Sequence, residues 1–104
     1  MSDTMIQSGL TLSKVRGHKA EILQAAARRG VKNIRVFGSL ARGEATAASD
    51  VDFLVEMEPH RGLFDLSGFW LDLEDLLGCP VDVATPGAIE PQMKDRIYAD
   101  AQEL

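Results

Sequence analysis

The segment "VFGSLARGEATAASDVDFLVEM", Val36 to Met57, determines the fold and raises the question of function. It begins with apolar residues that are typical of a strand, breaks at Gly38 and Ser39, and returns to an apolar run with two aspartates. Because side chains in a strand alternate between its faces, we expect Asp50 and Asp52 on the same face. Neighbouring carboxylates repel each other when both are ionised. A structural role alone does not account for this pair.

Apolar periodicity outside this segment predicts three helices and a further strand. The first helix is expected to begin at the N-cap Ser13 and to end at Gly30, and the second to end before Gly78 and Pro80. The apolar positions of the three helices are Val15, Ile22, Leu23 and Ala26; Leu66, Trp70, Leu73 and Leu77; and Ile89, Met93, Ile97 and Ala101. Strands are predicted over 33–38, 50–57 and 81–85, with a short helical turn over 39–43. The order α-β-β-α-β-α predicts an α/β (α+β) fold, a small mixed β-sheet with helices packed on it.

The length and the charge of the chain limit its function. We expect one domain over 1–104, with a loose lead-in over 1–12. A formal net charge of −5 argues against direct nucleic-acid binding, which needs a basic face. The single Cys79 is expected to be a small buried residue in a reducing compartment, and no stretch resembles a signal peptide or a membrane span. These features predict a cytoplasmic protein.

A third carboxylate is expected to join the pair. Asp82 lies in the otherwise apolar "PVDVAT" of the last predicted strand. Mg²⁺ prefers hard oxygen ligands and is commonly held between one or two carboxylates and substrate phosphates. A single aspartate at a strand end is more often a cap or a solvated residue. Three aspartates between branched apolar neighbours favour a metal site at Asp50, Asp52 and Asp82.

The break at Gly38 and Ser39 suggests a phosphate site. A turn between a strand and a helical segment can direct backbone N–H groups and a hydroxyl at phosphate oxygens. Arg42 would add a fork-shaped donor. The alternative is an ordinary strand-to-helix turn with Arg42 in solvent. The Gly38-Ser39 dipeptide is informative only because of its fixed spacing to Asp50 and Asp52.

One pattern in the chain resembles the signature of the nucleotidyltransferase superfamily: Gly38-Ser39, then ten residues, then Asp50-x-Asp52. "GSLARGEATAASDVDFLV" is similar to the minimal nucleotidyltransferases (MNT), and the resemblance extends to "LEDLLGCPVDVATP" and "IEPQMKDRIYADA". It implies a nucleotidyltransferase-like core with ATP as substrate. Asp50 and Asp52 would bind two Mg²⁺ ions. Asp82 would bind one of them and help to activate the acceptor hydroxyl.

The same resemblance implies that Gly38 and Ser39 hold the terminal phosphates of the nucleotide, with help from Arg42. It also implies a partner. MNT proteins resemble the antitoxin of a toxin–antitoxin pair that adds AMP to a tyrosine hydroxyl of a HEPN-type ribonuclease toxin. The chain departs from the pattern at Leu40, where relatives often carry a basic residue, and in the neutral run Ala45–Ala48. Both departures leave fewer positive charges near the phosphates.

Two other functions stay open at the level of sequence. One is an antitoxin that blocks its toxin by contact alone, and the other is a transferase acting on a small molecule. Some of the apolar residues in "RGLFDLSGFW" are candidates for an exposed partner surface, the alternative being that all of them are core: Leu63, Phe64, Leu66, Phe69, Trp70 and Leu71. We assign no functional role to His18, His60, Glu56 or Tyr98.

Overall fold

The computed structural model describes residues 11–44 and 50–104. Residues 1–10 of the predicted lead-in and the Ala45–Ala48 run lie outside the described residues. The elements are α2 (Leu12–Gly17), α3 (Lys19–Arg29), β1 (Val31–Phe37), α4 (Gly38–Ala41), β2 (Val51–Met57), α5 (Leu63–Leu77), β3 (Val81–Ala84), the short 3₁₀ helix η1 (Pro86–Ala88), α6 (Pro91–Asp100) and β4 (Gln102–Glu103).

The four strands form one sheet in the order β3-β2-β1-β4. Strand β1 is antiparallel to both β2 and β4, whereas β2 and β3 are parallel. The sheet is therefore mixed, as the sequence predicted. Parallel pairing of β2 with β3 requires a crossover connection, and α5 supplies it.

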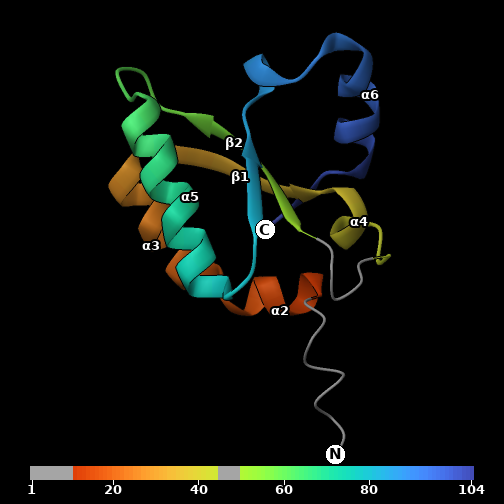
Figure 1. Ribbon diagram of the computed structural model, residues 1–104, viewed down its shortest axis with the longest axis horizontal. Coiled ribbons are helices and arrows are strands. Elements are labelled where there is room, and N and C mark those ends of the chain that lie inside the picture. The colour runs from red at the N-terminus through yellow and green to blue at the C-terminus, as the bar shows by residue number, and fades with distance from the viewer. Residues whose placement is uncertain (1–10, 45–49) are drawn as a thin grey trace, which may run out of the picture.

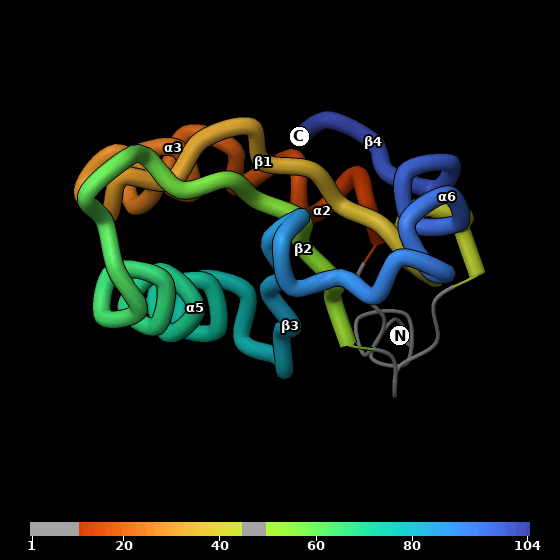
Figure 2. Tube along the Cα trace, turned by 90° about the horizontal axis from the view of Figure 1, so that it is seen from above, coloured from red at the N-terminus to blue at the C-terminus, as the bar shows by residue number. Residues whose placement is uncertain are grey.

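Helices cover the two faces of the sheet unequally. Figures 1 and 2 show α3 and α5 on one side of the strands, with α4 and α6 on the other. The α3/α5 face holds the main core, in which Ile22, Phe53, Phe69 and Leu73 are fully buried. A smaller cluster around Leu54 lies on the α6 face. Because β2 is apolar on both faces at its centre, it is the best-buried strand of the fold.

The N-terminal helix differs from the prediction. It is two helices, α2 and α3, which meet at His18. Gly17 has a low helix propensity, and the chain leaves helical geometry at the next residue. The N-cap is Thr11 rather than Ser13, because the Thr11 hydroxyl accepts a hydrogen bond from the Lys14 amide at 3.2 Å.

Several predicted boundaries and burials were also wrong. Strand β1 begins two residues before the predicted start and ends one residue earlier, and it contains an irregularity at Asn33, whose φ is 53°. Leu23 and Met93 are exposed, since the apolar faces of their helices are narrower than the periodicity suggested. Strand β4 was missed because two polar residues carry no periodic signal.

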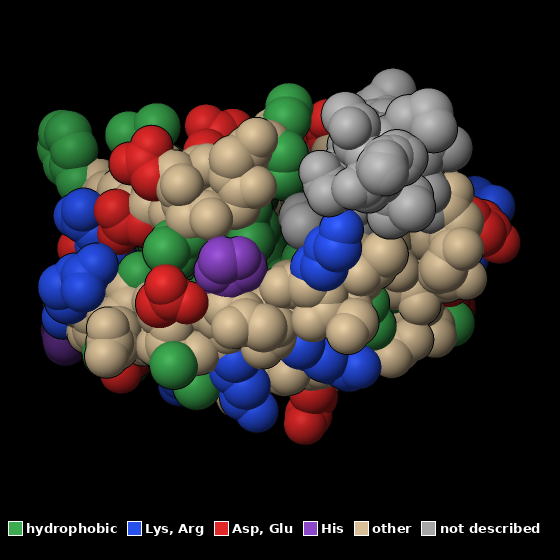
Figure 3. Space-filling model, turned by 90° about the horizontal axis from the view of Figure 1, so that it is seen from below, with side chains coloured by type: hydrophobic (Ala, Val, Ile, Leu, Met, Phe, Trp, Pro, Cys, Tyr) green, Lys and Arg blue, Asp and Glu red, His purple; other side chains and the backbone are tan. Residues whose placement is uncertain are grey.

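Helix α5 is apolar on its outer side as well as its inner side. Phe69 is fully buried, whereas Leu63, Phe64 and Leu71 are 76%, 94% and 62% exposed. The alternative in which all six apolar residues of this stretch are core is therefore wrong. Viewed from below, apolar side chains protrude on the side of the molecule where α5 lies (Figure 3). No helix among residues 11–44 and 50–104 has the length and apolarity to cross a membrane.

The two phenylalanines of α5 offer a matched test of this packing. Phe69→Ala should lower the free energy of unfolding by about 3–5 kcal/mol, because it leaves a cavity in the core. Phe64→Ala should change it by less than about 0.5 kcal/mol, because that ring is in solvent. Urea unfolding at about 1 µM protein measures both values. Equal losses would contradict the packing of α5 described above.

Candidate active site

The register of the sheet places two of the predicted aspartates side by side. Asp52 of β2 is the direct partner of Asp82 across the parallel ladder and of Phe37 across the antiparallel one. Asp50 directly precedes β2 and is exposed, as is Asp82. The side chains of Asp52 and Asp82 therefore share the sheet face opposite α5.

Gly38 touches the central carboxylate. It follows Phe37, the cross-strand partner of Asp52, and adopts a left-handed φ of 76°. A Cβ atom at this position would collide with Oδ2 of Asp52. Only glycine combines this conformation with such a close approach. The contact explains why the Gly-Ser dipeptide and the aspartates form one unit.

Ser39 lies in the single turn of α4, next to this contact. Its carbonyl oxygen accepts a hydrogen bond from the Glu44 amide at 2.8 Å, and the Gly38 carbonyl accepts one from the Arg42 amide at 3.1 Å. Leu40 and Ala41 are buried and attach the turn to the core. The position at which relatives often carry a basic residue is thus a packing position in this chain.

Asp52 is an electrostatically strained carboxylate. Burial raises its pKa to about 6, and the charges of Asp82 and Asp50 act in the same direction. The positive charge of Arg42 partly offsets them. The negative charges of all three predicted aspartates therefore interact with one another.

The donor set fits a hard divalent cation. The three aspartates offer only carboxylate oxygens, which suit Mg²⁺, and a cation would offset both the burial and the carboxylate repulsion that raise the pKa of Asp52. Within the described parts of the chain, no three Asp, Glu, His or Cys side chains are gathered closely enough to hold a metal by themselves. Substrate phosphates commonly complete a Mg²⁺ site of one or two carboxylates. The arrangement suits a site that is completed by substrate.

Arg42 is held by two carboxylates. Its Nε atom lies 3.0 Å from Oε1 of Glu44, and its Nη1 atom lies 2.5 Å from Oδ2 of Asp100 at the end of α6. The Arg42 side chain is 41% exposed, so it stays in contact with solvent while it pairs with these two carboxylates. Arg42 lies near enough to Asp52 to lower its pKa, but this geometry leaves fewer of its N–H groups for a phosphate.

No sequence pattern predicted the residues that brace α4. Asp100 and Gln102 come from the C-terminal segment, and the Gln102 side chain donates a hydrogen bond to the Ala41 carbonyl at 2.9 Å. Both contacts join residues about sixty positions apart. No local motif could have revealed them.

His18, His60 and Tyr98 are not buried. His60 is exposed in a turn with φ 70°, and His18 lies 3.3 Å from Glu21. Tyr98 is 41% exposed and faces the Arg35 guanidinium, which lies 5.9 Å from the ring centre. Cys79 is half-buried rather than buried, and burial raises its thiol pKa, with a smaller contribution from Asp50.

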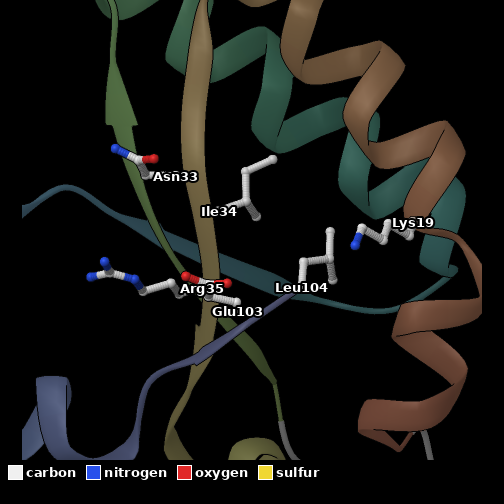
Figure 4. A pocket seen from close by; sticks show the side chains of 6 residues that line it. All are labelled: Lys19, Asn33, Ile34, Arg35, Glu103 and Leu104. Atoms are coloured by element: carbon white, nitrogen blue, oxygen red, sulfur yellow. The ribbon is translucent and has the colours of Figure 1, made fainter.

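A pocket at the opposite edge of the sheet contains none of the predicted site residues. It has a volume of about 230 Å³ and is lined by Lys19, Asn33, Ile34, Arg35, Glu103 and Leu104. Figure 4 shows these side chains around β1 and the C-terminal strand, with Lys19 reaching in from α3. It lacks a cluster of carboxylates, so the metal-binding chemistry does not belong there.

The electrostatic strain at Asp52 predicts a pH dependence of stability. A carboxyl group with a raised pKa binds its proton more tightly in the folded state, so stability is highest below the unfolded pKa and falls as pH rises from about 3.8 to about 6. Because the side chain is only half-buried, we expect a loss of about 1–2 kcal/mol. Asp52→Asn should abolish this loss in urea unfolding of the metal-free protein in EDTA. Asp95→Asn, on exposed α6, should retain it.

Gly38 and Gly43 form a matched pair for the close contact with Asp52. Both have a φ near 75°, but a Cβ on Gly43 would meet nothing within 4 Å. Gly43→Ala should therefore cost only the left-handed strain of about 1–2 kcal/mol. Gly38→Ala should cost about 1–3 kcal/mol more, and this excess should shrink when Asp52 is alanine. Unfolding free energies of the double-mutant cycle test this; no excess in the wild-type background would refute the contact.

Comparison with known proteins shows the family. Residues 19–104 match the family model described as "Nucleotidyltransferase domain". A Methanocaldococcus jannaschii protein named "Putative protein adenylyltransferase" is 41% identical over 86 residues, covering 83% of this chain and 92% of that protein. The protein adenylyltransferase MntA of Thermococcus cleftensis is 39% identical over 85 residues, covering 78% and 83%.

Solved structures agree with this assignment. One described as a "putative minimal nucleotidyltransferase" superposes with a TM-score of 0.81 at 38% identity, covering 91% of this chain and 97% of that one. A toxin–antitoxin structure with AMP-PNP has a TM-score of 0.67 at 16% identity, covering 82% and 70%, and shows the same fold. The contact of Gly38 with Asp52, and the pairing of Asp52 with Asp82, therefore occur on the expected fold. The chain belongs to the nucleotidyltransferase family, as a member of its minimal (MNT) type.

Proposed function

We propose that this nucleotidyltransferase is a cytoplasmic antitoxin that transfers AMP from ATP, with Mg²⁺, to a tyrosine hydroxyl of a HEPN-type ribonuclease toxin. The observation that carries the proposal is the contact of Asp52 with Gly38 and its pairing with Asp82. The names of the relatives support the chemistry, since MntA is called a protein adenylyltransferase. The toxin–antitoxin structure with AMP-PNP supports the nucleotide and the partner.

In this proposal Asp50, Asp52 and Asp82 would hold two Mg²⁺ ions together with the phosphates of ATP. Bound Mg²⁺ would supply neutralisation of the negative charge that develops during the displacement. Gly38 and Ser39 position the terminal phosphates through backbone N–H groups and the serine hydroxyl. Arg42 contributes positive charge from its position between Glu44 and Asp100.

The reaction forms one bond and breaks one. The acceptor tyrosine oxygen bonds to the α-phosphorus of ATP while the bond to the α–β bridging oxygen breaks, and pyrophosphate leaves. The phenolic proton must depart during the attack. We assign this proton to Asp82, which is exposed on the edge strand β3. Asp52, half-buried between strands, is instead the fixed centre of the site.

The position of Asp82 also suits an acceptor carried by another protein. Strand β3 is an edge of the sheet, and the Asp82 side chain is exposed on it, while Trp70 and Glu74 of α5 bond the carbonyl and the amide of the neighbouring Val81. Holding the acceptor hydroxyl in line with the α-phosphate would supply much of the rate enhancement. A partner protein that docks as a rigid body can provide this positioning.

Transfer of label tests the proposal. The protein is co-expressed with the protein encoded beside it, and the purified complex is incubated with α-³²P-ATP and Mg²⁺. We expect a labelled partner band that γ-³²P-ATP does not produce. Asp52→Asn and Asp82→Asn should each lower the rate at least about 100-fold, since each removes several kcal/mol of transition-state stabilisation. Asp95→Asn, the matched surface control, should leave it unchanged.

The negative outcomes are also informative. A stable complex that takes no label from any of the four nucleoside triphosphates would favour an antitoxin acting by contact alone. Label on a small molecule rather than on protein would favour the small-molecule transferase. Mass spectrometry of the labelled partner identifies the acceptor residue, and modification of a residue other than tyrosine would overturn that part of the proposal.

A further inference from the structure

Strand β3 carries Asp82 at an edge of the sheet, and its ladder is one-sided. The strand has four residues, and β2 is its one neighbour among the described strands. The Pro80 carbonyl accepts a hydrogen bond from the Val51 amide at 3.2 Å, and the backbone groups of Asp82 point the same way, towards β2. The N–H and C=O groups of Val81, the residue between them, therefore face away from β2. Such a short edge strand frays readily unless its outer groups find partners.

Two side chains of α5 are the partners of these outward backbone groups. The Trp70 indole Nε1 donates a hydrogen bond to the Val81 carbonyl at 2.6 Å, and Oε2 of Glu74 accepts one from the Val81 amide at 3.3 Å. An indole N–H can only donate and an ionised carboxylate can only accept, so each side chain suits the group that it meets. Both backbone groups of the residue directly before Asp82 are thus held from the helix.

The spacing along α5 explains why both side chains reach one residue. Trp70 and Glu74 are four positions apart, so they lie on the same face of the helix. Phe69 and Leu73 have the same spacing one position earlier, and both are fully buried in the core. A step of one residue turns an α-helix by roughly 100°, which moves the polar pair from the core to its border. Figure 2 shows β3 next to α5, at the border where this pair acts.

These contacts act on the geometry of the neighbouring carboxylate. The Val81 carbonyl belongs to the same planar peptide unit as the Asp82 amide. Trp70 holds one side of this unit, and pairing with β2 holds the other. A fixed peptide plane gives the Cα–Cβ bond of Asp82 a defined direction, beside its cross-strand partner Asp52.

We propose that Trp70 and Glu74 are positioning residues for the transfer reaction, which fix the backbone of β3 so that the Asp82 carboxylate lies within reach of the acceptor hydroxyl. This rests on the proposed function, because it assumes that Asp82 takes part in AMP transfer. In this role neither side chain touches the reacting groups, and each acts through Val81. Their loss should therefore affect the chemical step rather than the binding of ATP.

Hydrogen exchange of the isolated protein tests whether the contacts hold β3 in solution. The Val81 amide faces away from β2, so its protection depends on the Glu74 carboxylate. Glu74→Met keeps the length of the side chain without the acceptor, and it should speed exchange of this amide at least about fivefold. Glu74→Gln keeps an acceptor oxygen and should change the rate less than about twofold. Equal exchange rates in all three proteins would overturn the proposal, whatever their activity.

Kinetics of the co-purified complex test the positioning role. Trp70→Phe removes the N–H donor but keeps an aromatic ring. This variant and Glu74→Met should each lower kcat about tenfold and leave the KM for ATP within about twofold, because a misplaced carboxylate slows the chemical step. Ile22→Val, which loosens the core from α3 without removing either hydrogen bond, should leave both constants unchanged. Trp70→Phe should cost nothing further in an Asp82→Asn background, because it acts through that carboxylate.

The outcomes separate this inference from the proposed function. An active wild-type complex in which Trp70→Phe and Glu74→Met lose no rate would overturn the positioning role alone. A loss of rate that Glu74→Gln shares with Glu74→Met would also overturn it, since the charge rather than the acceptor oxygen would then matter. A wild-type complex that transfers no AMP would refute the proposed function and this role together.

Discussion

The carboxylate of Asp52 against the backbone of Gly38 is the contact on which the candidate site depends. It requires β1 to end where β2 begins, and it requires a residue without a Cβ at the first position of α4. Pairing of β2 with β3 then brings Asp82 to the other side of Asp52. The turn, the central carboxylate and the edge carboxylate are therefore positioned by one sheet register. A slip by one residue would turn both aspartates towards the opposite face.

The mutually repelling carboxylates lie on a strand whose other face is packed into the core. Asp52 is half-buried beside two other carboxylates, and its raised pKa reflects the resulting strain. The residues that alternate with it in β2, Val51 and Phe53, are fully or almost fully buried against α3 and α5. One strand thus supplies core packing on one face and chemistry on the other. A strained cluster of carboxylates is typical of functional sites, where a bound cation can later relieve the repulsion.

The C-terminal segment braces the turn at the candidate site. Asp100 pairs with Arg42, and Gln102 donates to the Ala41 carbonyl, so the end of α6 and strand β4 hold α4 from outside the sheet. A helix of one turn has little stability of its own, since it forms few internal hydrogen bonds. The position of Ser39 therefore depends on residues about sixty positions further along the chain.

Local sequence was sufficient for the elements with strong periodicity and for the residues of the candidate site. Gly38, Ser39, Asp50 and Asp52 stand in one short segment whose spacing is itself the signal, and Asp82 stands out in an apolar strand. The mixed sheet and the family followed from that pattern and were confirmed. Weak or polar segments were less predictable, which is why the break at His18 and strand β4 were missed.

What the sequence by itself determined is which residues are candidates for the chemistry, because most of them are neighbours in one strand–turn–strand unit whose geometry is local. Only the tertiary structure decided how they are supported and what else the surface offers. The pairing of Asp52 with Asp82, the clamp of Asp100 on Arg42 and the exposure of Phe64 opposite buried Phe69 all depend on which segments meet. Burial and charge interactions act through space, and a linear pattern cannot specify which of two apolar helix faces the rest of the chain will cover.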